Sequence, residues 1–316
     1  MSDKNIIIGI DTSNYTTSVA LVTTDGELIA NIKRPLPVRL GECGLRQSDA
    51  VFAHVKNLPE CMKEAREILD GRVPVAVGVS ERPRNVDGSY MPCFLSGVAA
   101  AESIGATLSV PVYRFSHQCG HVMAALYSSK NVDMINKEFC AFHVSGGTTD
   151  MLLVRPDENG FNITRLGGTD DLNAGQAIDR IGVMMGLSFP AGPKLEELAK
   201  NNTERFISKR PKIKDMKISL SGLENLAAKL YHDTKNAELS AAFTLDYIAN
   251  GLIMLADAYT EKYGKDTFVF SGGVMSNSII KEKISKKHDA VFAIPALSAD
   301  NAVGIAVLAA KKYTKN

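Results

Sequence analysis

The sequence predicts two α/β lobes, and three observations favour that fold class. The same order of elements (strand, small polar turn, strand, turn, strand) occurs twice along the 316 residues. Stretches with helical spacing separate the two copies, and no low-complexity linker divides the chain. We therefore expect a duplicated α/β fold with a cleft between its lobes. The first lobe should cover residues 1–115 and be completed by residues 300–316, and the second should cover residues 116–299.

The first copy of this order starts at a short apolar run near the N-terminus. Ile6–Ile10 is rich in β-branched residues and is followed by small polar residues, after which Val19–Val22 forms a second apolar run. Asp25 and Gly26 then form a typical hairpin turn. The pattern predicts antiparallel strands joined by tight turns.

The second copy begins in the middle of the chain. Phe139–Val144 resembles a strand, Ser145–Asp150 is a turn of small and polar residues, and Met151–Val154 is the next apolar run. Glu158–Gly160 then gives another turn before Phe161–Ile163. Sequence identity between the copies is low, so the duplication lies in the order of elements and in the turn chemistry.

Apolar residues at helical spacing predict the helices. Helices are expected over residues 48–69, 92–104, 117–127 and 238–263, and over a stretch that follows Asp171 and ends at Met185. A further strand, Thr267–Phe270, runs into a turn at Gly272 and Gly273. Asp300 is expected to be the N-cap of a last helix that continues to Lys312.

Composition excludes several classes of protein. Lys and Arg number 36 and Asp and Glu number 35, a balance that argues against a bulk polyelectrolyte binder. The longest apolar run near the end, residues 302–310, is too short to span a bilayer, and the N-terminus has no signal-peptide pattern. Five cysteines without CxxC spacing indicate reduced thiols. We expect a cytoplasmic protein that makes no contact with a membrane.

Glycine-rich turns are the first candidate for binding chemistry. Ser145, Gly146 and Gly147 could aim backbone N–H groups at a phosphate, and the glycines would permit close approach. A plain tight hairpin explains that turn equally well when it is taken alone. The second turn, Gly272-Gly273, follows a strand and could lie beside a nucleoside, or glycine could be needed there for steric reasons only.

His117 and His121 are the candidate metal ligands. Residues at i and i+4 share one face of a helix, so both imidazoles could bind one ion. Two unrelated surface histidines are the alternative. A carboxylate would have to complete the site, and the spacing alone does not select one. The remaining histidines are isolated, and a structural role is expected for His54, His143, His232 and His288.

Two further features have both a functional and a structural interpretation. Asp179 could accept hydrogen bonds from ribose hydroxyls, or it could pair with its neighbour Arg180. The basic segment from Arg205 to Lys217 could contact nucleic-acid phosphates, or it could be an ordinary solvated surface.

An ordered set of motifs runs through nearly the whole chain. They are Gly9-Ile-Asp-Thr-Ser13, His117-x3-His121, Val144-Ser-Gly-Gly147, Leu166-Gly-Gly-Thr-Asp-Asp171, Gly175-x3-Asp179, Gly186-Leu-Ser-Phe-Pro-Ala-Gly-Pro193, Ser221-Gly-Leu223, Ser271-Gly-Gly-Val-Met-Ser-Asn277 and Ser298-Ala-Asp-Asn301. The set resembles the TsaD/Kae1/Gcp family, formerly labelled O-sialoglycoprotein endopeptidase or peptidase M22. It is far more specific than any single motif.

This resemblance implies a fold and a reaction. The fold would be the actin-like ATPase (ASKHA) type, with two duplicated lobes around a nucleotide-binding cleft. The reaction would be the metal-dependent transfer of a threonylcarbamoyl group from threonylcarbamoyl-AMP to N6 of the adenosine next to the anticodon in tRNA, known as t6A synthesis. The enzyme would be an acyltransferase, and no covalent enzyme nucleophile is required, so no residue is assigned as catalytic beyond the metal site.

The resemblance also implies which residues bind the cofactors. The metal, Fe²⁺ or Zn²⁺, would be held by His117, His121 and Asp300. The adenine nucleotide (threonylcarbamoyl-AMP, ATP or AMP) would be held by His143, Val144, Ser145, Gly146, Gly147, Asp179, Gly192 and Asn277. Partner subunits of a TsaB/TsaE-like complex, or a second copy of the chain, are expected, with tRNA as the substrate.

The sequence departs from the family pattern in three places. The family's Cys-Asp-Glu-Thr segment is replaced by one that contains Tyr15 and Thr16, its Gly-Gly-His-Thr turn has Thr148 in place of His, and its Gly-Pro-Gly stretch is replaced by Ser80–Gly88. Two alternatives therefore remain open. One is a divergent paralogue, a carbamoyltransferase or ATPase with a non-tRNA acceptor, and the other is a non-catalytic nucleotide-binding partner.

Overall fold

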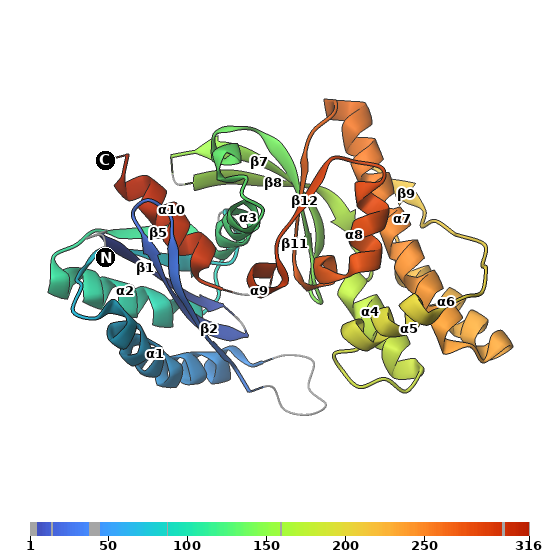
Figure 1. The fold of residues 1–316 in the computed structure, drawn as a ribbon, viewed down its shortest axis with the longest axis horizontal. Helices are drawn as coiled ribbons and strands as arrows, with labels where there is room; N and C mark the ends of the chain where they lie inside the picture. The colour runs from blue at the N-terminus through green and yellow to red at the C-terminus, as the bar shows by residue number, and fades with distance from the viewer. Residues whose placement is uncertain are drawn as a thin grey trace. The chain divides into compact units, whose positions relative to one another are not determined.

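The structure is a computed structural model that describes residues 5–13, 15–37, 45–86, 88–158, 160–298 and 301–315. It contains two compact units, each with its own sheet and helices (Figure 1). Unit 1 consists of Met1–Lys137, Arg155–Ile163 and Ala299–Asn316, and unit 2 consists of Glu138–Val154 and Thr164–Ser298. Two α/β units were the prediction from the repeated order of elements.

The sheet of unit 1 has the strand order β3-β2-β1-β4-β5. Its strands are β1 (Ile6–Ser13), β2 (Thr16–Thr23), β3 (Leu28–Pro35), β4 (Pro74–Arg82) and β5 (Val112–Ser116). The first three are antiparallel neighbours, as the turn pattern predicted, whereas β4 and β5 run parallel to β1. Every residue of β1 is buried, so this strand lies between two covered faces of the sheet.

Helices α1 (Gln47–Leu69) and α2 (Phe94–Leu108) pack against one face of this sheet. Alternate residues of the strands face them, because side chains along a strand point to opposite sides. The shared core contains Ile6, Ile8, Ile10, Val19, Leu21, Leu58, Cys61, Ala65, Val77, Val79 and Ala101. Helix α1 matches the expected range closely, and α2 is displaced from it by a few residues.

Helix α10 (Val303–Tyr313) packs against the opposite face and is the last helix of the chain. A Cβ atom at Gly9 would lie 2.6 Å from the carbonyl oxygen of Ala302, and one at Gly78 would lie 2.9 Å from that of Ile305. The two glycines therefore let the backbone of α10 approach the sheet directly. As predicted, the C-terminal helix completes the first unit, while its expected N-cap Asp300 lies outside the described residues.

The boundary of unit 1 differs from the expected one after residue 115. Helix α3 (His117–Ser128) and the short η1 (Val132–Asn136) belong to unit 1, which continues to Lys137. The physical reason is close packing of α3 on α10, because a Cβ atom at Gly304 would lie 1.9 Å from the carbonyl oxygen of Gly120. Residues 155–163, which we expected in the second lobe, also belong to unit 1.

The sheet of unit 2 has the strand order β12-β11-β6-β7-β8-β10-β9. Its strands are β6 (Phe139–Val144), β7 (Thr149–Asp157), β8 (Gly160–Thr169), β9 (Ile213–Lys214), β10 (Lys217–Ile218), β11 (Phe268–Ser271) and β12 (Ala290–Phe292). Strand β6 pairs antiparallel with β7 and parallel with β11, just as β1 pairs with β2 and β4. The structure thus confirms the internal duplication.

Helices of unit 2 surround a core of stacked aromatic rings. They are α4 (Ala174–Met184), α5 (Gly192–Asn201), α6 (Ser221–Thr234), α7 (Ala237–Tyr263), α8 (Ser278–Ser285), the short α9 (Pro295–Ser298) and η2 (Gly273–Ser276). The rings of Phe142 and Phe270 stack with centroids 4.7 Å apart. Helices α5 and α6 were not expected, and the other long helices were.

Helix α7 is the one described helix that is long and apolar enough to cross a membrane. Most of its apolar stretch, 83%, is buried inside the structure, where its side chains contribute to the core of unit 2. The long apolar helix is therefore accounted for by burial within the protein.

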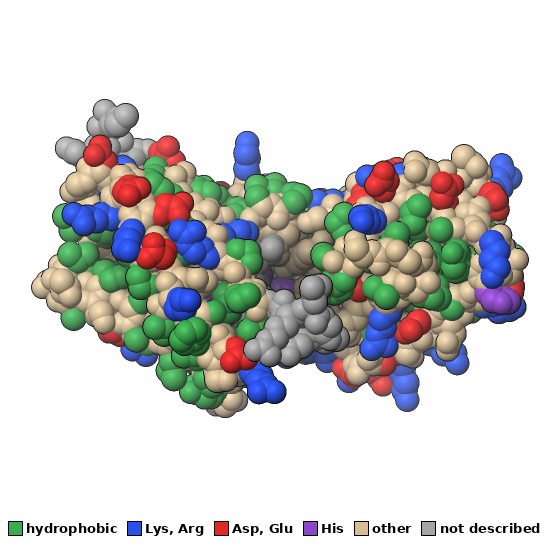
Figure 2. Space-filling view, turned by 90° about the horizontal axis from the view of Figure 1, so that it is seen from below, with side chains coloured by type: hydrophobic (Ala, Val, Ile, Leu, Met, Phe, Trp, Pro, Cys, Tyr) green, Lys and Arg blue, Asp and Glu red, His purple; other side chains and the backbone are tan. Residues whose placement is uncertain are grey.

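On the face of the molecule shown in Figure 2, Lys and Arg side chains lie among Asp and Glu side chains on both units. This mixture agrees with the near balance of 36 basic and 35 acidic residues in the whole chain. Such a surface has little long-range attraction for a polyanion, because the fields of neighbouring opposite charges largely cancel at a distance.

Candidate functional site

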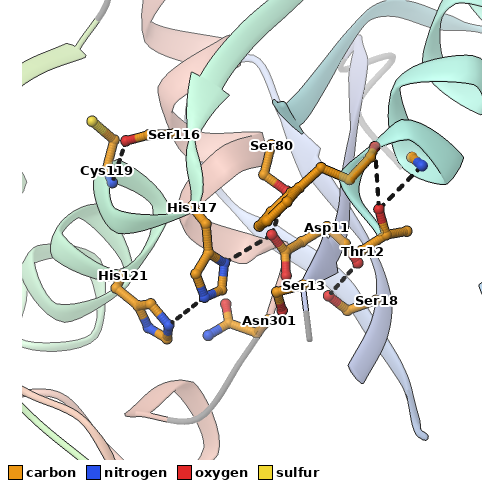
Figure 3. A network of polar contacts seen from close by, with 12 residues as sticks. Asp11, Thr12, Ser13, Ser18, Ser80, Ser116, His117, Cys119, His121 and Asn301 are labelled. Atoms are coloured by element: carbon orange, nitrogen blue, oxygen red, sulfur yellow. Dashed lines mark hydrogen bonds and ion pairs between the residues drawn. The ribbon is translucent and has the colours of Figure 1, made fainter. Parts of the chain in front are cut away.

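The two histidines of the HxxxH motif lie on one face of α3, in unit 1 (Figure 3). The helix begins at His117, and the Ser116 side chain caps it by accepting a hydrogen bond from the Cys119 amide at 3.2 Å. The Nε2 atoms of His117 and His121 are 2.9 Å apart. The structure therefore brings the sequence-predicted pair together at the ring atoms that bind metals.

Asp11 at the end of β1 orients the first of these histidines. Its side chain is fully buried, and its Oδ1 accepts a hydrogen bond from Nδ1 of His117 at 2.9 Å. Ser80, on β4, donates its hydroxyl to the same oxygen. An ionised carboxylate accepts only, so the proton of the His117 ring is on Nδ1, and its Nε2 accepts the hydrogen bond from His121. Sequence reasoning did not assign Asp11 a role.

A signal for Asp11 was present in the sequence. It is the one charged residue in the otherwise apolar and small-polar run Ile6–Ser13, and β1 buries every residue of that run. A buried carboxylate needs hydrogen-bonding partners. Which residues supply them could not be inferred, because Ser80 and His117 are far away in sequence.

The donor set of this pair fits a transition-metal ion. Two nitrogens bound at about 2.0–2.1 Å in neighbouring positions are roughly 3 Å apart, which matches the Nε2 separation. A histidine that binds metal usually donates its other N–H to a carboxylate, which is the bond that His117 makes. Among the described residues no three His, Cys, Asp or Glu side chains gather as a metal site, and Asp300 lies outside them.

The Ser-Gly-Gly turn joins β6 and β7 in unit 2. The Ser145 amide donates to the carbonyl oxygen of Thr148 at 2.8 Å, which closes the turn. Gly146 and Gly147 are exposed, and a Cβ atom at either position would meet no other atom within 4 Å. The space in front of both glycines is open, so their backbone could approach a ligand closely.

The N-terminus of α4 lies directly against this turn. Its Gly175 amide donates to the carbonyl oxygen of Ser145 at 3.2 Å, and a Cβ atom there would lie 2.6 Å from Cα of Gly146. The positive end of a helix dipole together with glycine amides is a general anion-binding arrangement. This arrangement favours the phosphate-binding interpretation of the turn over that of a plain hairpin.

The second glycine turn packs against the first strand of the same sheet. A Cβ atom at Gly272 would lie 2.3 Å from the carbonyl oxygen of Val144, and Gly272 has φ +98°. The steric interpretation of this glycine is therefore correct. His143 lies beside Ser271 in the parallel pairing of β6 with β11, so the residues from His143 to Gly147 and the Gly272 turn share one end of the sheet.

Asp179 and Gly192 lie where α4 meets the start of α5. Oδ1 of Asp179 accepts a hydrogen bond from the Ala191 amide at 2.8 Å, and burial raises the pKa of its carboxyl. Arg180 pairs instead with Glu224, its Nη1 3.3 Å from Oε2, so the alternative pairing with Asp179 is wrong. Oδ2 of Asp179 makes no hydrogen bond within the described part of the chain and could accept one from a ligand.

Asn277 caps the next helix of the unit. Its Oδ1 accepts a hydrogen bond from the Ile280 amide at 3.0 Å, and the residue is 7% exposed. Its Nδ2 group is thereby left to donate to a nucleoside. Ser278 donates hydrogen bonds to Oε1 of Glu196, on α5, from its amide at 3.0 Å and from its hydroxyl at 2.6 Å. The sequence patterns did not predict this contact.

Asp171, in the Leu-Gly-Gly-Thr-Asp-Asp motif, has a structural role. It accepts hydrogen bonds from the Ser219 hydroxyl at 2.7 Å and from the Leu220 and Ser221 amides at 3.1 Å, where α6 begins. Burial acts to raise the pKa of this carboxyl, but these hydrogen bonds hold it well below its usual range. The motif that contains Asp171 and the motif that begins at Ser221 thus meet at the N-terminus of α6, where Asp171 accepts hydrogen bonds from backbone amides.

The isolated His54 is a structural residue, as expected. It is fully buried on α1, its Nε2 donates to the carbonyl oxygen of Ser13 at 2.9 Å, and its Nδ1 accepts from the Thr17 hydroxyl at 2.8 Å. Burial lowers the pKa of its imidazole. The neutral ring ties α1 to the β1–β2 hairpin.

Comparison with known sequences identifies a family. A family profile described as "TsaD: tRNA N6-adenosine threonylcarbamoyltransferase" matches residues 46–307. The chain is 31% identical to the tRNA N6-adenosine threonylcarbamoyltransferase of Streptococcus suis (strain 05ZYH33), across 100% of this chain and 94% of that protein. It is 29% identical to the protein of the same name from Thermosipho africanus, across 98% and 95% of the two chains.

Comparison with solved structures identifies the fold as actin-like ATPase (ASKHA). The full-length HypF protein, solved in its phosphate- and nucleotide-bound form, matches with a TM-score of 0.61 and 12% identity, across 97% of this chain and 55% of HypF. Component A of (R)-2-hydroxyglutaryl-CoA dehydratase from Acidaminococcus fermentans matches with a TM-score of 0.55 and 13% identity, across 98% and 99% of the chains. At these identities the likeness concerns the fold alone.

Proposed function

Because the chain belongs to the tRNA N6-adenosine threonylcarbamoyltransferase family, we propose that it transfers threonylcarbamoyl from threonylcarbamoyl-AMP to N6 of an adenosine in tRNA, with one Fe²⁺ or Zn²⁺ ion. The observation that carries this proposal is the convergence of the His117 and His121 Nε2 atoms, 2.9 Å apart, with Asp11 behind the first ring. A purely structural histidine pair would not need a buried carboxylate that orients one ring toward the other.

In this proposal His117, His121 and Asp300 hold the metal ion. When bound, the ion would supply a Lewis acid that stabilises negative charge on an oxygen of the donor. The protein's own contribution is orientation: Asp11 keeps the His117 proton on Nδ1, so that Nε2 presents its lone pair to a cation. Cys119 is 1% exposed on the same helix and takes no part in the site.

The donor nucleotide would be held by unit 2. The amides of Gly146 and Gly147, which lie beside the N-terminus of α4, would bind phosphate, and Asp179, Gly192 and Asn277 would contact the nucleoside. Oδ2 of Asp179 supports this role, because it is the carboxylate oxygen that the Ala191 amide leaves available. Orientation of the donor, without a covalent enzyme intermediate, would provide the rate enhancement.

A second candidate function is carbamoyl transfer to a non-tRNA acceptor by a divergent paralogue. The specific observation that favours it is Tyr15, which stands where the family carries an acidic residue and is 44% exposed at the β1–β2 turn. Partner subunits, or a second copy of the chain, and a cytoplasmic location belong to the same proposal under either function.

Mass spectrometry of tRNA tests the proposed function. Unmodified tRNA would be incubated with threonylcarbamoyl-AMP, Fe²⁺ or Zn²⁺ and the purified protein, with and without partner subunits from the same source, and then digested to nucleosides. Threonylcarbamoyl-adenosine and AMP are the expected products. AMP release without a modified nucleoside would select the second candidate function, and the absence of both products with active partners would contradict the two.

A further inference from the structure

The segment from Arg205 to Lys217 concentrates positive charge that the proposed chemistry does not use. It contains six basic residues and a single acidic one, Asp215. The whole chain has 36 basic and 35 acidic residues, so the remainder has 30 and 34 and is net acidic. A polyanion would therefore be attracted to this segment more than to the rest of the chain.

Most of these cations are not neutralised by the protein itself. Five of the six basic side chains are exposed and form no ion pair with any described residue. They are Arg205, Lys209, Arg210, Lys212 and Lys214. The sixth, Lys217, places its Nζ 2.5 Å from Oδ2 of Asp170. Like charges at neighbouring positions of a segment repel one another, and an anionic ligand would lower that repulsion.

Hydrogen bonds to α7 hold the segment in place although it has little regular secondary structure. Asn250 of α7, 7% exposed, donates from Nδ2 to the carbonyl oxygen of Lys209 at 2.8 Å and to the Ser208 hydroxyl at 2.9 Å. Ser208 in turn donates to Oδ2 of Asp246 at 2.5 Å. The backbone between two of the cations is thus tied to a core helix.

Apolar contacts anchor the segment at two further points. The Phe206 ring lies edge-on to Phe243 with centroids 5.9 Å apart, and Pro211 is buried against Gly251, where a Cβ atom would lie 3.1 Å from Cγ of the proline. Figure 1 shows this stretch in yellow, beyond α5 and leading to β9. Phe206 and Pro211 pack against the protein, and the basic side chains are exposed. A ligand would therefore bind a segment that is already ordered, which lowers the entropic cost of binding.

We propose that the 205–217 segment binds the phosphate backbone of RNA, an inference that rests on the proposed function and places its tRNA substrate on unit 2. Phosphate contacts by Lys and Arg supply most of the sequence-independent affinity of nucleic-acid-binding proteins. An ordered segment with five exposed cations that form no ion pair with a described residue suits that task. An acidic protein partner is the competing ligand, and the test separates the two.

Binding of an unmodified tRNA transcript, measured by fluorescence anisotropy between low salt and 200 mM KCl, tests the proposal. The full chain would be compared with the triple variant Lys209→Ala/Lys212→Ala/Lys214→Ala. Each lost phosphate contact lowers the slope of log K against log [salt] by about 0.7–0.9, so the triple variant should lose roughly 2–3 units of slope. Its affinity should fall by about 10- to 100-fold at low salt.

Two control variants separate the position of the lost charge from the loss of lysine side chains. Lys262→Ala/Lys265→Ala/Lys287→Ala removes the same charge from exposed positions at the other end of α7 and after α8, and it should bind like the wild type. Lys209→Arg/Lys212→Arg/Lys214→Arg keeps the charge and should keep the slope. Equal losses in both alanine triples, or none in either, would overturn the proposal. The proposal would also be overturned if the segment bound polyglutamate as tightly as it binds tRNA.

The proposed function and this inference can fail separately. If the wild-type protein forms threonylcarbamoyl-adenosine and the segment triple keeps the wild-type KM for tRNA, the RNA surface lies elsewhere while the activity stands. If the segment binds tRNA with the expected salt slope but no modified nucleoside forms, the surface stands and the activity does not.

Discussion

Nδ1 of His117 lies 2.9 Å from Oδ1 of Asp11, and the Asp11 side chain has no exposed surface. Ser80 donates to the same carboxylate oxygen, so three elements of unit 1 (β1, β4 and α3) meet at one atom. Since an ionised carboxylate cannot donate, this contact selects the tautomer of His117. The orientation of His117, the proposed metal ligand, therefore depends on β1, a strand that is distant in sequence.

Replacement of Asp11 by asparagine should weaken metal binding. The amide of the new side chain could donate to Nδ1 and thereby favour the other tautomer, whose Nε2 carries the proton and cannot bind a cation. Loss of a carboxylate behind a metal-bound histidine typically costs about 10- to 100-fold in affinity. Equilibrium dialysis with Zn²⁺ would measure it, with Asp233→Asn, at an exposed site on α6, as the control.

A second readout of the same variant does not depend on metal. Imidazole ¹⁵N shifts of the metal-free protein should report a protonated Nδ1 at His117 in the wild type and a protonated Nε2 in Asp11→Asn. An unchanged tautomer in a folded Asp11→Asn protein would show that Asp11 does not control the ring.

His117→Ala should abolish metal binding without unfolding the protein. The side chain is 18% exposed at the start of α3, and the Ser116 cap that starts the helix does not depend on it. Metal analysis of the purified variant and its far-UV circular dichroism spectrum would be compared with those of His232→Ala, an exposed histidine on α6. Full metal content in His117→Ala would place the metal elsewhere.

Gly272→Ala and Gly147→Ala should separate steric from functional glycines. A Cβ atom at Gly272 would lie 2.3 Å from the Val144 carbonyl oxygen, and its φ of +98° strains any other residue. We expect Gly272→Ala to lose about 1–3 kcal/mol of stability from backbone strain alone. Urea unfolding would measure the difference.

For Gly147→Ala, the expectation is the opposite. No atom lies within 4 Å of the added Cβ, so stability should stay within about 1 kcal/mol, while the methyl group should obstruct phosphate and weaken AMP binding measured by calorimetry. Unaltered AMP affinity would argue against the Ser-Gly-Gly turn as the phosphate site.

Acidification should destabilise the protein through His54. Burial lowers the pKa of its imidazole in the folded state, so the unfolded chain takes up the proton first as the pH falls. Its contribution is fully present above the unfolded pKa of about 6.5 and is lost as the pH falls from there through the lower folded value. Urea midpoints at pH 8 and pH 5 should differ less in His54→Gln than in the wild type.

A matched variant isolates this effect from general acid sensitivity. His232→Gln removes an exposed histidine and should leave the difference between the two midpoints unchanged. If both variants change that difference equally, the pH dependence does not originate at His54.

Residue patterns were sufficient to predict the duplicated hairpins, most of the long helices, the α/β class and the pairing of His117 with His121. These follow from short-range rules: strand alternation, helical spacing and turn residues act between neighbours in the chain. The motif order was sufficient to indicate the family, which the comparisons confirmed.

Residue patterns did not predict the role of Asp11, the cap that Asp171 provides for α6, the assignment of α3 to unit 1 or the anchoring of the 205–217 segment by Asn250. Each depends on residues that are tens of positions apart, such as Asp11 with Ser80 or Asn250 with Lys209. Such contacts form because a buried polar group that has no hydrogen-bonding partner costs free energy. Local patterns reveal that a partner is needed, and packing of the whole chain decides which residue provides it.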